Sequence, residues 1–201
     1  MKKTFRYFIY SLIILSTFAI GNAIYADISI EDLKNEYANE QSQFIEVNEM
    51  DVHYRDEGEG FPIVLIHGTA ASLHTWDDWT EELKKTNRVI RMDLPAFGIT
   101  GPNKNADYSL QAYTDFLNSF IDKLKLEKFH LAGNSLGGNI AWNYAADYPQ
   151  KVEKLILVDA SGLPTNKQPP SIFKMAKNPL LKTLFLYVTP KMLIKKNIEE
   201  V

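Results

Sequence analysis

A serine flanked by glycines is the part of this sequence best suited to chemistry. The turn that carries it consists of Gly133, Asn134, Ser135, Leu136 and Gly137, between a strand-like run at 128–132 and a helix-like run that Pro149 closes. A serine on a sharp strand-to-helix turn presents its hydroxyl above the sheet. Glycines are needed two residues before and two residues after it, because side chains there would strike neighbouring backbone. The pattern predicts a nucleophilic serine and acyl-transfer chemistry.

Two further observations qualify this prediction. An ordinary helix-capping serine is the alternative interpretation, but a cap does not explain why Gly133, Gly137 and Gly138 occur together. The usual base for a nucleophilic serine is a histidine, and the histidines of this sequence are His53, His67, His74 and His130. None of them follows Ser135, so we expect the usual general base to be missing.

The elements that must position Ser135 alternate between strands and helices. Residues 44–47 and 52–54, joined around 48–51, have the alternating faces of an antiparallel hairpin. Apolar runs at 62–66, 88–92, 129–132 and 154–158 predict further strands, separated by helices, one of which starts after an N-cap at Ser109. This order is typical of an α/β protein with a mainly parallel sheet and helices on both faces.

Three other segments of the sequence form a set with the serine turn. They are the strand and loop at 64–68, the segment 93–98 and the strand end at 155–159. Together they resemble the α/β-hydrolase fold family, close to single-domain serine esterases and lipases with a helical cap, over residues 44–201. The resemblance implies eight strands, with an acid after the seventh and a histidine after the eighth. We therefore expect a fold truncated after the sixth strand and within the helical cap.

The resemblance also implies roles for backbone groups near Ser135. The N–H of Leu136 and that of Thr69 or Ala70 would hold the developing oxyanion. Gly68 fits as the residue that lets this loop turn without a Cβ clash. His67 of the same loop would position backbone, and a catalytic role for His67 is the alternative.

Aspartates end two of the predicted strands. Asp159 follows the sixth strand, where some members of the family place the triad acid, and a turn-forming residue beside Ser161 and Gly162 is the alternative. Asp93 precedes Pro95 and Gly98, so we expect it to shape a loop.

Composition describes an ordinary folded domain of the α/β class. Apolar residues make up 45% of the chain and charged residues 23%, and the formal net charge is −3, which argues against nucleic acid as a partner. The absence of cysteine excludes disulfides, a thiolate nucleophile and cysteine metal sites. No histidine has a second metal ligand at helical or turn spacing, so we expect neither a metal nor a cofactor.

The first 26 residues have the character of a leader. Three cations precede an uncharged stretch at 7–26, which as a helix would span about 30 Å, enough for a bilayer core. We expect a membrane anchor here, with a cleaved signal peptide and a core helix as alternatives. Either export form would place the folded part on the non-cytoplasmic side. Residues 27–43, with a short amphipathic helix at 30–37, would link the leader to the first part of the hydrolase domain at 44–162.

Composition changes again at residues 163–201, which we interpret as the start of a helical cap. The apolar stripe of this segment, which could roof an acyl pocket or pack as core, consists of Leu180, Leu181, Leu184, Phe185 and Val188. Its lysines would face solvent or anionic headgroups.

These observations predict a serine hydrolase that acts on carboxylic esters or lipid-like substrates through an acyl-enzyme on Ser135. Because acid and base are missing, we expect the 201-residue chain alone to be inactive or only weakly active. A catalytically inactive hydrolase-like binding module or a gene fragment is one alternative. A different reaction of the same serine, such as C–C bond hydrolysis or perhydrolysis, is another.

Overall fold

The computed structural model describes residues 2–21, 28–164 and 178. The chain divides into two units, one made of Met1–Ile28 and Thr165–Val201 and the other of Ser29–Pro164. The second unit contains the sheet and every candidate site residue. The apolar stripe expected in the cap lies outside the described residues.

Helix α1 (Lys2–Gly21) belongs to the first unit. The sequence predicted an uncharged span over 7–26, whereas the helix begins among the cationic residues and ends at Gly21. Among the described residues, no helix combines the length and the apolar character that a membrane crossing requires. The role of residues 1–26 as an anchor or a cleaved signal stays a prediction.

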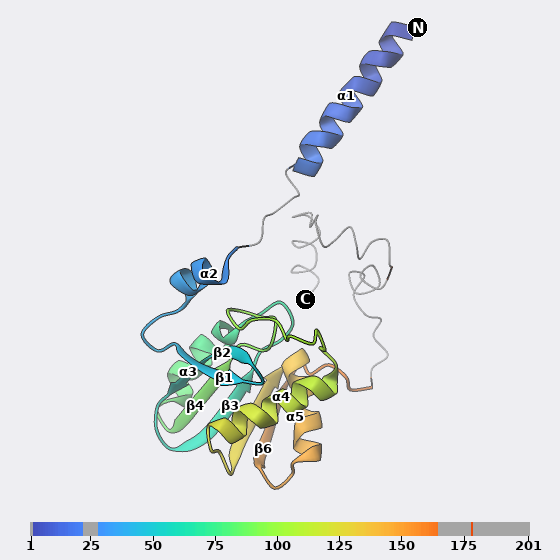
Figure 1. The fold of residues 1–201 in the computed structure, drawn as a ribbon. Helices are drawn as coiled ribbons and strands as arrows, with labels where there is room; N and C mark the ends of the chain where they lie inside the picture. The colour runs from blue at the N-terminus through green and yellow to red at the C-terminus, as the bar shows by residue number, and fades with distance from the viewer. Residues whose placement is uncertain (1, 22–27, 165–177, 179–201) are drawn as a thin grey trace. The chain divides into compact units, whose positions relative to one another are not determined.

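A six-stranded sheet forms the centre of the second unit, in the order β1-β2-β4-β3-β5-β6 (Figure 1). Its strands are β1 (Gln43–Val47), β2 (Met50–Glu57), β3 (Phe61–Ile66), β4 (Asn87–Met92), β5 (Phe129–Asn134) and β6 (Val152–Val158). β2 pairs antiparallel with β1 and with β4, and the other neighbours pair in parallel. The predicted mainly parallel sheet is confirmed.

The hairpin that opens the sheet has a tighter turn and a longer second strand than predicted. Val47 pairs with Met50, so Asn48 and Glu49 alone form the turn, with φ values of 48° and 63°. Positive φ at both residues gives a backbone twist that matches the flanking strands. β2 continues to Glu57 because its second half pairs with β4.

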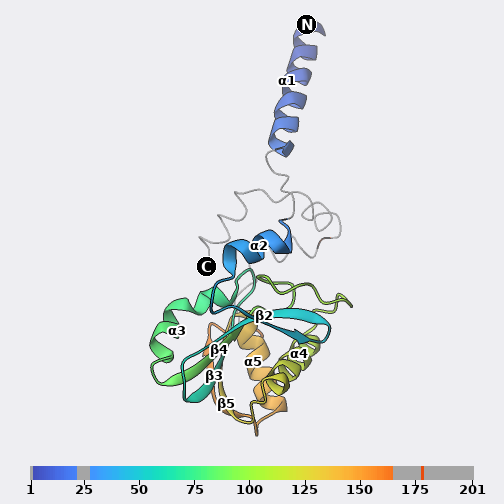
Figure 2. The same ribbon diagram turned by 60° about the vertical axis from the view of Figure 1, so that its left-hand side comes forward.

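Helices cover both faces of the sheet, as predicted (Figure 2). Helices α4 (Leu110–Lys123) and α5 (Leu136–Asp147) pack on one face together with Val64 and Ile66 of β3. The short 3-10 helix η1 (Leu73–Trp76) and helix α3 (Asp77–Leu83) pack on the other face, where Trp76 joins Ile63 and Leu65. β3 is therefore buried on both sides, which explains its continuous apolar sequence.

Both predicted helices near the domain begin after a serine cap, of which the sequence predicted the one at Ser109. The Ser109 side chain accepts a hydrogen bond from the N–H of Ala112 at 3.2 Å, which confirms it as the N-cap of α4. Helix α2 (Ile30–Tyr37) is capped by Ser29, and its Lys34 forms an ion pair with Asp51 of β2 at 2.7 Å. The helix expected in the linker thus contacts the sheet and belongs to the same unit.

Candidate active site

Ser135 occupies a strained turn between β5 and α5. Its backbone angles are φ 49° and ψ −111°, a combination that is unfavourable for a residue other than glycine. Neighbouring backbone holds it there: its N–H donates to the Val158 carbonyl at 3.0 Å, and its carbonyl accepts from the Ser161 N–H at 3.0 Å. The Ser135 side chain makes no capping hydrogen bond to α5, so the capping interpretation is wrong.

The glycines around Ser135 are required by close backbone contacts. A Cβ atom at Gly133 would overlap the carbonyl of Gly137, and one at Gly137 would overlap the carbonyls of Ile66 and His67. These contacts confirm the steric reason given for the glycines. They also place the start of α5 directly against the end of β3.

The loop after β3 lies beside the serine. A Cβ atom at Gly68 would stand 2.8 Å from Oδ1 of Asn134 and 3.1 Å from the Cβ of Ser135, so the missing side chain allows the two segments to approach this closely. Thr69 and Ala70 follow and are exposed, and Ala70 has a φ of 57°. Leu136 is the first residue of α5, so its N–H has no acceptor within the helix. The three residues expected to donate to an oxyanion thus lie within two residues of Gly68 or Ser135 along the chain.

His67 is fully buried and uses both ring nitrogens to hold backbone. Its Nε2 accepts from the N–H of Leu94 at 3.0 Å, which leaves the proton on Nδ1 to be donated to the Gly68 carbonyl at 2.8 Å. Burial lowers the pKa of His67, and the Gly68 contact opposes this shift only in part. A neutral histidine with both nitrogens engaged orients the loop and is not free to take a proton from Ser135.

Asp93 fixes the loops that follow β3 and β4. Its carboxylate accepts from the N–H of Leu73 at 2.8 Å, the N–H of Ile99 at 3.0 Å and Nδ1 of His53 at 2.8 Å. Burial alone raises the pKa of Asp93, but these hydrogen bonds outweigh burial and hold the pKa below its ordinary value. Nε2 of His53 in turn contacts the Ser42 hydroxyl at 2.8 Å. The sequence indicated a loop-forming role for Asp93 but gave no sign of its partner His53, 40 residues earlier.

Comparison with known proteins decides the family. Residues 62–184 match the family model described as the alpha/beta hydrolase fold. The chain belongs to the α/β-hydrolase family. One curated relative, the 2-hydroxymuconate semialdehyde hydrolase of a Pseudomonas strain, is 35% identical over 111 residues, which make up 54% of this chain and 39% of the relative. The chain therefore spans less than half of the length of that relative.

Solved structures give the same family. A meta-cleavage product hydrolase of Pseudomonas fluorescens is 31% identical, with a TM-score of 0.59, and the match covers 66% of this chain and 53% of that one. A protein of Acinetobacter baumannii provisionally called a lipase is 28% identical, with a TM-score of 0.64, and the match covers 87% of this chain and 65% of that one.

In this α/β-hydrolase, Asp159 lies next to the serine turn in the sheet register. Asn134 of β5 pairs with Val158 of β6. Ser135 directly follows Asn134, and Asp159 directly follows Val158. Asp159 is exposed and has a φ of 44°. The structure thus brings together the backbone of the candidate nucleophile and that of the candidate acid.

The histidines of this α/β-hydrolase are all described, and each contacts residues other than Ser135. His53 and His67 are engaged as above, and Nδ1 of His74 lies 3.2 Å from Asp77. The His130 ring packs on Phe61 with centroids 4.6 Å apart, and its buried Nδ1 has no partner among the described residues. Within the described ranges, no group of three or more His, Asp or Glu side chains could hold a metal ion.

Proposed function

We propose that this chain carries the nucleophile of a serine hydrolase that cleaves carboxylic esters. The observation that carries the proposal is the strained Ser135 between β5 and α5, with a side chain that makes no capping bond and Gly68 packed against it. Strain of this kind persists only where the surrounding structure maintains it, and it is concentrated at functional sites. Family membership supports the same reading.

The reaction follows from the groups that surround the serine. Ser135 Oγ attacks the ester carbonyl carbon, its proton passes to a base, and the alcohol leaves with a proton to give an acyl-enzyme. Water then attacks the same carbonyl and releases the acid. The N–H groups of Leu136 and of Thr69 or Ala70 stabilise the oxyanion in both steps, and each donor lowers the barrier by about 3 kcal/mol.

The proton acceptor limits the turnover of the 201-residue chain. His67 and His53 use their ring nitrogens in structural hydrogen bonds, and His67 supports the loop of the proposed oxyanion donors. Loss of the histidine base in a serine hydrolase costs on the order of a millionfold in kcat. We therefore propose that this chain alone acylates slowly and turns over weakly.

Hydrolysis of a C–C bond beside a ketone is the second candidate function. It is favoured by the names of two relatives, 2-hydroxymuconate semialdehyde hydrolase and meta-cleavage product hydrolase. Such a reaction would also use Ser135, but the leaving group would be a carbanion equivalent that needs protonation at carbon rather than at oxygen.

A single-turnover experiment tests the ester proposal. Purified chain at high concentration is mixed with p-nitrophenyl acetate, and release of p-nitrophenolate is followed together with the intact mass of the protein. We expect one acetyl group per chain on Ser135, absent in Ser135→Ala and present in the control Ser119→Ala, which removes a hydroxyl that donates to the Asp115 carbonyl within α4. Acetylation that is equal in wild type and Ser135→Ala would contradict the proposal. A 2-hydroxy-6-oxo-dienoate, followed by loss of its absorbance, tests the second candidate in the same samples.

A further inference from the structure

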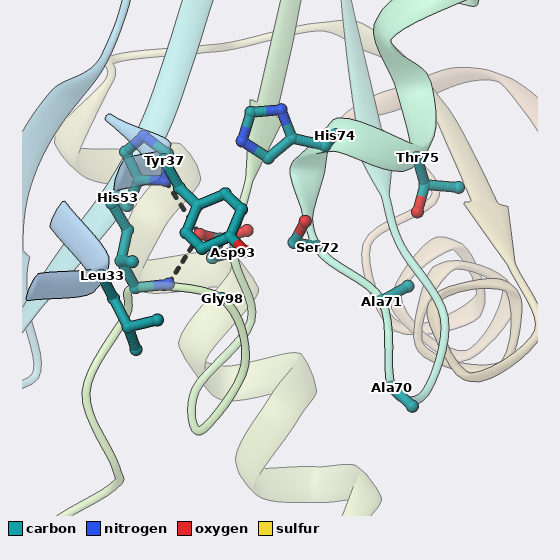
Figure 3. A pocket seen from close by; sticks show the side chains of 11 residues that line it. Leu33, Tyr37, His53, Ala70, Ala71, Ser72, His74, Thr75, Asp93 and Gly98 are labelled. Atoms are coloured by element: carbon teal, nitrogen blue, oxygen red, sulfur yellow. Dashed lines mark hydrogen bonds and ion pairs between the residues drawn. The ribbon is translucent and has the colours of Figure 1, made fainter. Parts of the chain in front are cut away.

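A pocket of about 480 Å³ lies between helix α2 and the segment that continues the proposed oxyanion loop (Figure 3). Leu33 and Tyr37 line it from α2, Ala70 and Ser72 line it from the loop, and His74 and Ile99 also belong to its wall. Its volume falls within the range of about 300–1,000 Å³ found for small-molecule sites. Helix α2 lies outside residues 62–184, the part of the chain that matches the family model.

The hydrogen-bonding groups still free at this pocket are few. The Asp93 carboxylate already accepts three hydrogen bonds, and both ring nitrogens of His53 are engaged. Nδ1 of His74 faces the Asp77 carboxylate and therefore carries the proton, which makes Nε2 of the neutral ring an acceptor. This Nε2 is buried and has no partner within the structure described. The Ser72 hydroxyl makes no capping bond to η1 and can donate or accept.

The charge near the pocket selects against an anion. Asp93 lines the pocket and has a lowered pKa, so it is a carboxylate at neutral pH. Asp77 adds a second carboxylate beside His74. Two guanidinium groups lie nearby: Arg55 and Arg91 both face Asp77, and Arg91 also pairs with Glu57. A ligand carboxylate would therefore enter a site where the carboxylates of Asp93, Asp77 and Glu57 outnumber the two guanidinium groups, which is costly in a partly buried site.

We propose that this pocket binds a neutral alkyl alcohol. The alkyl chain packs against Leu33 and Ile99, and the hydroxyl donates to His74 Nε2 and accepts from Ser72. Helix α2 forms the outer wall, so the size of its side chains sets the length of chain that fits. The ligand also touches Ala70, two residues after Gly68, and two residues of chain span at most about 7 Å. The site does not depend on the reactivity of Ser135.

Calorimetric titration of the whole 201-residue chain tests this proposal, in the Ser135→Ala background so that no turnover interferes. The probes are 1-decanol and decanoate, which differ only in the charged end group. We expect saturable binding of one 1-decanol per chain and at least about tenfold weaker binding of decanoate, because its carboxylate would be buried where carboxylates already outnumber the guanidinium groups. Equal affinities for the two probes, or no saturable binding of 1-decanol, would overturn the proposal.

Two substitutions locate the binding site. Leu33→Trp fills the pocket from α2 and should lower the affinity for 1-decanol by about tenfold or more, whereas Asn35→Trp adds the same ring to an exposed position of α2 and should leave it unchanged. His74→Phe keeps a ring but removes the acceptor and should weaken binding about three- to tenfold. The same affinity in Leu33→Trp and Asn35→Trp would place the ligand elsewhere and refute the assignment. Failure here would leave the acetylation of Ser135 unaffected, so the two proposals are tested separately.

Discussion

Replacing Asp93 with asparagine removes one acceptor from the contact that ties the segment after β3 to the loop after β4. One carboxylate oxygen accepts from the Leu73 N–H, and the other accepts from the Ile99 N–H and His53. The amide of asparagine keeps one oxygen, and it retains more hydrogen bonds if that oxygen faces Ile99 and His53. The N–H of Leu73 then meets an NH₂ group instead of an acceptor.

The magnitude follows from the number and type of these bonds. A hydrogen bond to a charged group contributes about 1.5–3 kcal/mol, and a buried N–H left without an acceptor costs a similar amount. Asp93→Asn loses one such bond and weakens two, so we expect the free energy of unfolding to fall by about 3 kcal/mol. That is a large fraction of the roughly 5–15 kcal/mol that stabilises a typical domain.

Urea unfolding at two pH values provides the assay. The pKa of Asp93 is lowered in the folded state, so its contribution to stability is present above the unfolded pKa of about 3.9 and is lost as pH falls through the folded value. The difference between wild type and Asp93→Asn should therefore be large at pH 7 and shrink at acid pH. The exposed Asp147→Asn serves as control and should change stability by less than about 0.5 kcal/mol. A difference below about 1 kcal/mol at pH 7, or one that persists unchanged in acid, would refute the reasoning.

Three further substitutions test other parts of the fold. Gly137→Ala forces a Cβ against the carbonyls of β3 and should cost about 2–4 kcal/mol in urea unfolding, whereas Gly101→Ala meets nothing within 4 Å and should cost far less. Ser109→Ala removes the cap of α4 and should cost about 1 kcal/mol, and an unchanged midpoint would contradict the cap. His67 has a lowered pKa, so the unfolded chain binds its proton first and stability should fall as pH drops below about 6.5. His67→Gln should flatten that slope, measured by unfolding between pH 7 and pH 5, and an unaltered slope would show that other groups cause it.

The fold class could be predicted from the sequence because its signals are local. The apolar run at 62–66 and the cap at Ser109 correspond to features that short segments determine by themselves, and both appear in the structure. The two-residue turn at Asn48 and Glu49 could not be predicted in detail, since no glycine indicates the positive φ at Glu49. Its geometry follows from the pairing of β1 with β2, which is a property of the sheet.

The candidate site was predictable where residues adjoin the serine and not where distant segments meet. The spacing of the glycines around Ser135 is enough to predict that side chains at these positions would clash with neighbouring backbone. The contact of His53 with Asp93 joins residues 40 positions apart, and nothing near either residue indicates it. The pocket under α2 was missed for the same reason, because α2 looks like a linker until its contact with the sheet is known.

The most direct test of the central claim is a search for covalent labelling of Ser135. Purified chain is incubated with a fluorophosphonate, in which the serine oxygen displaces fluoride from phosphorus, and the labelled peptide is identified by mass spectrometry. We expect one label per chain on Ser135, slow because no histidine is positioned as its base, and none in Ser135→Ala. A folded wild-type chain that stays unlabelled, or a label on any other residue, would contradict a nucleophilic Ser135.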